Sequence, residues 1–120
     1  ADPTRGIATS GWRGRSMSFG IADAVTVLAT NAAMADAAAT MIANAVDLPG
    51  HPAIQRRPAS DSEVAPELAE RLVTEEVGPL TEEEIATALN RGAAFAQSCL
   101  DRGLIHAAQL SLSGQTRVVQ

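Results

Sequence analysis

The sequence contains no lysine and no tyrosine, and all nine of its basic residues are arginine. The absence of lysine excludes Schiff-base and lysine general-base chemistry by this chain, and the absence of tyrosine excludes phenol acid–base chemistry. Cysteine occurs once, as Cys99, so an internal disulfide is excluded and a reducing compartment is expected. Because Cys99 stands in an apolar stretch, we expect a small buried hydrophobic residue there.

Aromatic residues are also scarce, at 2% of the 120 residues, although 46% of the chain is hydrophobic. Enough apolar material is present for the core of one domain, but that core must be built mostly from alanine and small aliphatic side chains. Such side chains bury little apolar area each, so the folded chain is expected to be only marginally stable alone. This composition favours a chain that is stabilised by a partner.

The formal net charge is −5 with a pI near 4.9, so no broad basic face is available to bind nucleic acid. The sequence shows no signal-peptide pattern and no apolar run of about 18 residues, which predicts no membrane span. We therefore expect a cytoplasmic protein that binds neither nucleic acid nor a membrane.

The apolar pattern predicts an α+β fold, with a mixed or antiparallel sheet packed by two main helices. Helices are expected at residues 32–46, after the capping residue Asn31, and at 82–101, where Thr81 and Glu84 have capping-box spacing. Strands are expected at 6–11, 24–29, 72–77, 104–112 and 115–119, with a strand-like piece at 17–23. Residues 46–66 are predicted to form a surface excursion, and 67–71 to hold one helical turn.

Two short motifs are candidates for binding an anion. The turn Thr9-Ser10-Gly11 offers hydroxyl and backbone N–H donors, and it is followed closely by Arg13 and Arg15. Donors of these kinds bind phosphate and carboxylate groups. The same residue types are common in solvated turns, so a purely structural role stays open.

The predicted helix at 32–46 carries a candidate metal site. Asp36 and Thr40 are four residues apart and therefore lie on one face, one turn from each other. Oxygen ligands of this kind suit Mg²⁺ or Ca²⁺. The alternatives are an exposed acid and a threonine that bonds back to the preceding turn.

Three further residues are candidates for proton transfer or catalysis. The two histidines, His51 and His106, are the only side chains that titrate near neutral pH without perturbation. Neither has a partner adjacent in sequence, so turn and strand roles are open for them. Asp23 ends a strand-like segment, where it can serve a site or cap a turn.

The stretch from Gly6 to Ala29 resembles the ApbE-like superfamily. The segments V-T-V-L-A at 25–29 and A-D-A-A-A-T at 35–40 match a strand V-T-V-x-A followed by a helix with A-D-A-x-x-T. Thr9-Ser10-Gly11 matches the T-S-G turn of that family. The closest resemblance is to an uncharacterised ApbE-related bacterial and archaeal branch of the form GIATSG-x-x-GRS-x-S-x-GIADAVTVLA.

The resemblance implies an ApbE-like fold and a site for a flavin nucleotide and Mg²⁺. ApbE is a Mg²⁺-dependent transferase that moves FMN from FAD to a protein threonine. Carried over to matching positions, Asp36 and Thr40 would be metal ligands, and Thr9, Ser10 and Gly11 would line the nucleotide site. The family's His-x-x-Asp-Pro segment is altered here, because residues 19–24 contain neither His nor Pro. A metal-dependent transferase or hydrolase-like activity therefore stays open, and a retained pocket with altered chemistry is expected.

The resemblance also implies that this chain is the C-terminal half of a larger domain. Members of the family are about twice as long, and the sequence begins at Ala1 without methionine. We therefore expect a fragment or processed subunit whose partner is the N-terminal half of the same protein or a second subunit, in an oligomer. The alternative to a ligand-binding enzyme is a non-catalytic assembly subunit that completes the sheet of another chain.

Overall fold

A computed structural model describes residues 5–13, 18–58 and 72–120. It confirms the α+β class, with two helices and antiparallel sheets. The elements in chain order are β1 (Gly6–Ser10), β2 (Ala24–Ala29), α1 (Ala32–Ala45), β3 (Ile54–Pro58), β4 (Leu72–Val77), α2 (Glu82–Asp101), β5 (Ala107–Leu112) and β6 (Gln115–Val119). Among these residues, no helix is long and apolar enough to cross a membrane.

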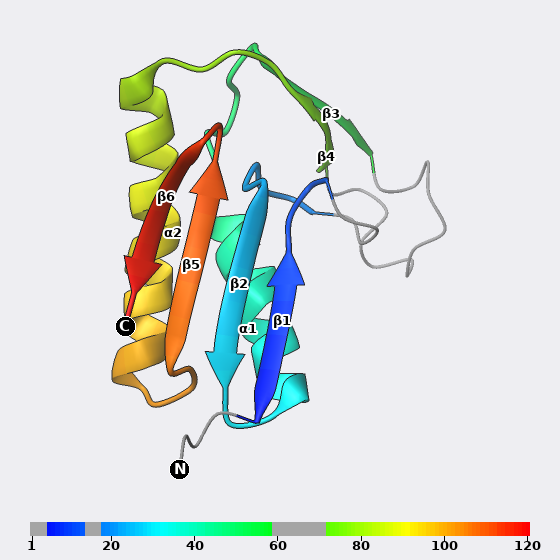
Figure 1. Ribbon diagram of the computed structural model, residues 1–120. Coiled ribbons are helices and arrows are strands. Elements are labelled where there is room, and N and C mark those ends of the chain that lie inside the picture. Colours follow the sequence, from blue (N-terminus) through cyan, green and yellow to red (C-terminus); the bar gives the residue numbers. More distant parts are fainter. Residues whose placement is uncertain (1–4, 14–17, 59–71) are drawn as a thin grey trace.

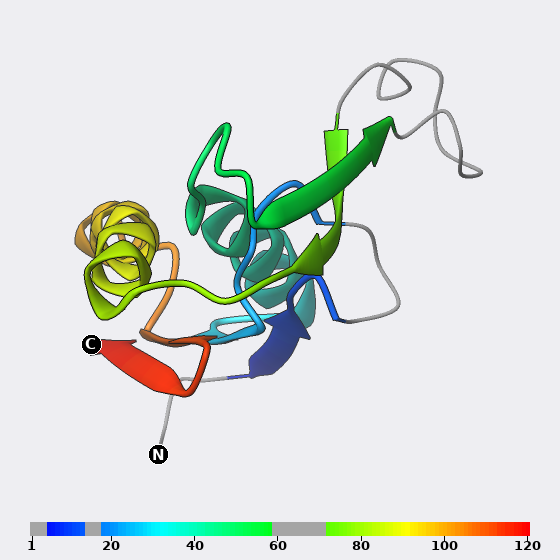
Figure 2. The same cartoon turned by 90° about the horizontal axis from the view of Figure 1, so that it is seen from above.

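The main sheet has four antiparallel strands in the order β1-β2-β5-β6. Both helices lie side by side on one face of it, α1 over β1 and β2 and α2 over β5 and β6 (Figures 1 and 2). Strand β2 is central, as its apolar sequence predicts. Its second face is not covered by any described element, so the side chains of β2 alternate between buried and half-buried.

The helices begin where their capping residues predict. The side chain of Asn31 accepts a hydrogen bond of 2.8 Å from the backbone N–H of Met34, which satisfies a donor that α1 leaves open. Thr81 and Glu84 form the reciprocal bonds of a capping box at the start of α2. Helix α1 ends one residue earlier than predicted, at Ala45, and α2 has the predicted bounds.

The core lies between the helices and the inner face of the sheet and is built from small side chains, as the composition predicts. Val25 and Val27 of β2 are fully buried, and so are Leu110 and Leu112 of β5. Gly92 of α2 allows close packing, because a Cβ there would lie 2.2 Å from Cγ2 of Val46 and 2.7 Å from Cδ2 of Leu110. Close approach of the two helices thus depends on residues with little or no side chain.

The β5–β6 hairpin turns at two residues with positive φ, Ser113 at 48° and Gly114 at 82°. Two such residues make a type I′ turn, whose twist matches that of the flanking strands. The strand predicted at 115–119 is confirmed. Strand β5 begins at Ala107 and not at Leu104, since the backbone N–H of Leu104 still bonds to Cys99 O at the end of α2.

The predicted surface excursion at 46–66 contains a strand that the sequence analysis missed. Strand β3 pairs with β4 in a separate two-stranded sheet, which projects away from the main sheet (Figure 2). Strand β4 has its predicted bounds. Residues 59–66, and the helical turn predicted at 67–71, lie outside the described residues.

The strand-like piece predicted at 17–23 is not a strand over residues 18–23. This segment crosses the end of α1, where the backbone N–H of Ile21 donates to Val46 O at 2.8 Å. At Gly20, a Cβ would lie 2.2 Å from Ala43 O. The backbone around Gly20 and Ile21 is therefore held against the C-terminal end of a helix, and the segment makes only single hydrogen bonds to strands, from Thr74 N–H to Ser18 O and from Asp23 N–H to Ser111 O.

Candidate functional site

The end of β1 and the start of β2 form a polar corner around Asp23. Nε1 of Trp12 and Nε of Arg13 both donate to Oδ1 of Asp23, at 3.1 and 2.9 Å. The backbone N–H of Ser113 donates to Oδ2 at 2.8 Å. The Arg13 guanidinium also lies over the Trp12 ring, 4.7 Å from its centroid. Asp23 thus ties the loop after β1 to the β5–β6 hairpin.

Gly11 is required for the shape of this corner. A Cβ at Gly11 would lie 2.4 Å from the carbonyl oxygen of Asp23 and 2.9 Å from that of Ala22. The glycine of the T-S-G turn therefore lets two backbone segments approach each other. The side chain of Arg13 is 65% exposed. Arg15 lies outside the described residues.

The two hydroxyl residues of the T-S-G turn face opposite sides of the sheet. Thr9 is exposed on the side away from the helices, and its Oγ1 lies 2.9 Å from Oγ1 of Thr26. Ser10 pairs in register with Val25, whose side chain is buried against the helices. Residues that pair directly across two antiparallel strands share a face, so Ser10 lies on the helix side. The two hydroxyls are therefore not brought together.

Asp36 and Thr40 are both exposed on α1. Met34, Ala38 and Met41 of the same helix line a hollow against Phe95 and Cys99 of α2. At 100° per residue, Asp36 and Thr40 fall on the other flank of α1, away from α2 and toward the β1 edge of the sheet.

Among the described residues, no group of three or more His, Cys, Asp or Glu side chains is placed to hold a metal ion. Thr9 lies on the far side of the sheet from Asp36 and Thr40, and Ser10 lies on the same side as they do. Of the two hydroxyl residues in the T-S-G turn, only Ser10 therefore shares a side of the sheet with the proposed metal ligands.

The histidines occupy separate structural positions. His51 lies between α1 and β3, where its Nδ1 accepts the backbone N–H of Ala53 at 3.0 Å and its Nε2 contacts a carboxylate oxygen of Glu84. Nε2 of His106 lies 3.3 Å from Oγ1 of Thr30, at the end of the sheet opposite the Asp23 corner. Neither histidine is in contact with Asp23, so the structure does not assemble these three candidates into one site.

Cys99 is buried, as its sequence context predicts. Burial raises the pKa of the Cys99 thiol above its usual value, and the positive charge of Arg102 offsets this only in part. A raised pKa reduces the thiolate fraction at neutral pH, which agrees with a packing role.

A dense polar network at the C-terminal end of α1 was missed by the sequence analysis. Oδ1 of Asn44 accepts from Oγ of Ser18 at 3.2 Å and from the backbone N–H of Phe19 at 3.0 Å. Arg56 of β3 donates to Phe19 O at 2.9 Å and pairs with Asp47. Oγ1 of Thr74 donates to Gly20 O at 2.6 Å. The network fixes the 18–20 segment between α1 and the β3–β4 hairpin.

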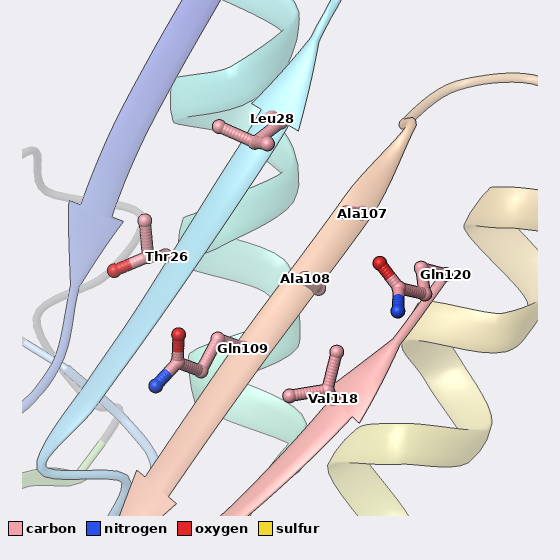
Figure 3. A pocket seen from close by; sticks show the side chains of 7 residues that line it. All are labelled: Thr26, Leu28, Ala107, Ala108, Gln109, Val118 and Gln120. Carbon is pink, nitrogen blue, oxygen red and sulfur yellow. The ribbon is translucent and has the colours of Figure 1, made fainter.

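The side of the main sheet away from the helices carries a shallow hollow of about 280 Å³. Figure 3 shows Thr26 and Leu28 of β2 on one side of it, Val118 and Gln120 on the other, and the strand with Ala107 between them. Two of the exposed large hydrophobic residues, Ile7 at 67% and Val118 at 58%, belong to strands of this sheet. This hollow was not predicted from the sequence.

A relative of known sequence supports the resemblance. A UPF0280 protein of Methanothermobacter thermautotrophicus is 56% identical to this chain over 46 residues, which are 38% of the chain and 18% of that protein. The aligned region therefore spans less than one fifth of the relative, which is about twice as long as this chain. No solved structure matches the sequence.

A family model covers nearly all of the chain. The model described as "AbpE bacteria" matches residues 1–118, a range that includes the Asp23 corner, Asp36, Thr40 and both helices. The chain therefore belongs to this AbpE bacterial family.

Proposed function

We propose that this chain is the ligand-binding part of an ApbE-like protein, and that its Asp23 corner binds a small phosphate- or carboxylate-bearing ligand. The observation that carries the proposal is the way Asp23 holds Arg13. Nε of Arg13 donates to Asp23 and the guanidinium lies over the Trp12 ring, while 65% of the Arg13 side chain is exposed just after the T-S-G turn. A guanidinium that is already oriented loses less side-chain entropy when it binds an anion.

A divalent cation on Asp36 and Thr40 is the second part of the proposal. The two side chains fit a hard cation in chemistry, since both offer oxygen atoms and both are exposed one helical turn apart. When bound, Mg²⁺ would neutralise negative charge on a phosphate group. Asp36 and Thr40 would fill only two positions around the cation. Water, the bound small molecule or residues of a partner half would fill the rest of its coordination shell.

A flavin nucleotide is the ligand that the ApbE resemblance suggests, but the transferase reaction itself is not part of the proposal. Counting back from Asp23, the histidine of the His-x-x-Asp-Pro segment falls at Gly20. A Cβ at Gly20 would lie 2.2 Å from Ala43 O, so a side chain is incompatible with this backbone. Binding with a changed or absent reaction therefore fits these residues better than flavin transfer.

Calorimetric titration of FMN, with and without Mg²⁺, tests the proposal. We expect Arg13→Gln to weaken FMN binding by about tenfold, the value of one charge-assisted hydrogen bond. The control Arg102→Gln removes an exposed arginine elsewhere and should leave the affinity unchanged. Asp36→Asn should abolish the effect of Mg²⁺ on the affinity for FMN. Its control is Glu83→Gln, which removes a carboxylate from another exposed helix position. Equal affinity in Arg13→Gln and wild type would overturn the anion site, and a persisting Mg²⁺ effect in Asp36→Asn would overturn the cation site.

The free edges of the main sheet favour a second candidate function, a non-catalytic assembly subunit. Strands β1 and β6 each pair on one side only with described strands. Exposed strand edges are templates for pairing with another chain, such as an N-terminal half or a second subunit. Thermal unfolding of residues 1–120 alone tests this candidate: a sharp transition of a stable monomer would count against an obligate partner.

A further inference from the structure

The hollow between the two helices, which lie side by side on the main sheet, is lined by sulfur (Figure 2). Met34 and Met41 line it from α1, and Cys99 lines it from α2. These are all the sulfur-containing residues that the structure describes, since the remaining methionine, Met17, lies outside the described ranges. One thiol and two thioethers thus border a single hollow of about 90 Å³.

The other residues that line this hollow offer no competing metal ligand. Most of them are apolar, namely Ala37, Ala38, Phe95 and Leu104. The exception is Arg102, whose guanidinium is a cation with donors only and does not coordinate a metal. Cys99 is a free thiol and only 7% exposed, whereas Met41 is 54% exposed. The hollow therefore presents a buried thiol behind an accessible thioether.

These ligands favour one kind of metal ion. Thiolate and thioether sulfurs select Cu(I), Zn²⁺ or iron–sulfur clusters. An iron–sulfur cluster takes several cysteine thiolates, and structural Zn²⁺ takes a full tetrahedral set of thiolate, imidazole or carboxylate ligands. A single thiol with two thioethers satisfies neither of these, so Cu(I) is the ion that fits this set.

The charge of the hollow also favours a monovalent ion. A metal ion that binds Cys99 displaces the thiol proton to the solvent, which leaves a thiolate with one negative charge. Cu(I) cancels that charge, so the bound ion and the thiolate together add no net charge to an apolar hollow. A divalent ion would leave one positive charge there, beside the guanidinium of Arg102.

We propose that Cys99, Met41 and Met34 bind one Cu(I) ion between α1 and α2. The side chain of a helical residue lies over the turn before its own Cα, so Met41 extends toward Ala37 and Ala38, which line the same hollow. Met34 begins about two turns earlier on α1, and the rotatable bonds of its side chain let it adapt as the third ligand. The site is independent of the proposed function, because neither Arg13 nor Asp36 lines this hollow.

Anaerobic titration with Cu(I), in competition with the chromophoric chelator bicinchoninate, tests the site. We expect one Cu(I) per chain, with an affinity lowered at least about 100-fold in Cys99→Ala and about tenfold in Met41→Leu. Phe95→Leu is the control, because it alters the lining of the same hollow without removing a sulfur atom. A chain that does not compete with the chelator overturns the proposal. So does wild-type affinity in both Met41→Leu and Met34→Leu, which would leave only a thiol that binds alone.

X-ray absorption at the copper edge tests the ligand set directly. The loaded chain should show sulfur neighbours alone, at about 2.3 Å as in other metal–sulfur sites. Nitrogen or oxygen neighbours would place the ion at a histidine or carboxylate and contradict the proposal. In a parallel titration Zn²⁺ should not bind at the concentrations that saturate the chain with Cu(I), and equal binding of the two ions would contradict the selectivity argued from charge.

Discussion

Oδ2 of Asp23 accepts a hydrogen bond of 2.8 Å from the backbone N–H of Ser113, a residue 90 positions later in the chain. Ser113 has a positive φ of 48°, which is unfavourable for a residue with a side chain. The carboxylate thus satisfies the N–H of a residue held in an unfavourable conformation. The same carboxylate orients Arg13, so the Asp23 corner combines a stabilising contact with the proposed anion site.

Asp23→Ala should lower the free energy of unfolding by about 2 kcal/mol, because it removes the acceptor of a backbone N–H and of the Trp12 indole. The ion pair with Arg13 should add little to this loss, since Arg13 is mostly exposed. Urea denaturation measures the effect. Asp36→Ala, which removes an exposed carboxylate from α1, should change stability by less than about 0.5 kcal/mol. Equal losses in the two variants would show that Asp23 does not stabilise the hairpin.

Ser113→Asn should stabilise the protein by about 0.5 kcal/mol. The two turn residues both have positive φ, and Asn-Gly is the preferred pair for a type I′ turn because Asn tolerates this conformation better than Ser. The substitution leaves the backbone N–H of residue 113 in place, so its hydrogen bond to Asp23 is unaffected. Thermal denaturation should therefore give a higher Tm for Ser113→Asn, and a lower Tm would contradict the assignment of the turn.

Local patterns in the sequence predicted the helices and most strands, since their determinants lie within a few residues. Asn31 and the Thr81–Glu84 box mark helix starts, and the alternation of Val25 and Val27 marks a buried strand face. Strand β3 was missed because its sequence, with a proline and two adjacent arginines, lacks the apolar alternation that is typical of a strand. Its stability comes from β4 and from the bond of Arg56 to Phe19 O, contacts that no local pattern encodes.

The candidate site was predictable only in part, for the same reason. Spacing correctly placed Asp36 and Thr40 together on an exposed helix face. The strand predicted at 6–11 implies that Thr9 and Ser10 face opposite sides of a sheet, but it could not predict which of them lies on the helix side, because that depends on the pairing with β2. Nor could it predict the three donors on Asp23, which come from the loop after β1 and from a hairpin near the end of the chain.

Gly20→Ala should lower the free energy of unfolding by about 3 kcal/mol. The new Cβ would lie 2.2 Å from Ala43 O and 2.7 Å from Val46 O, so the backbone of the segment or of α1 would have to move. Gly50→Ala is the control: Gly50 has a positive φ of 75° but open space around it, so only about 1 kcal/mol of backbone strain is expected. Urea denaturation compares the two. A loss in Gly20→Ala no larger than in Gly50→Ala would contradict the close packing of this segment on α1.

The contact between His51 and Glu84 predicts part of the acid sensitivity of the fold. The backbone N–H of Thr81, and then the His51 imidazole, hold the pKa of the Glu84 carboxyl below its usual value of 4.5. Because the pKa is lower in the folded than in the unfolded chain, ionised Glu84 stabilises the fold above about pH 4.5, and this contribution is lost as the pH falls through the folded pKa. Glu84→Gln keeps an acceptor for Thr81 but removes the titration, so stability should fall less steeply with acid. Thermal denaturation at several pH values below 6 measures the slope, with Glu83→Gln as the control for charge in the same turn. If the Glu84→Gln slope equals that of wild type, the carboxylate of Glu84 does not couple folding to pH.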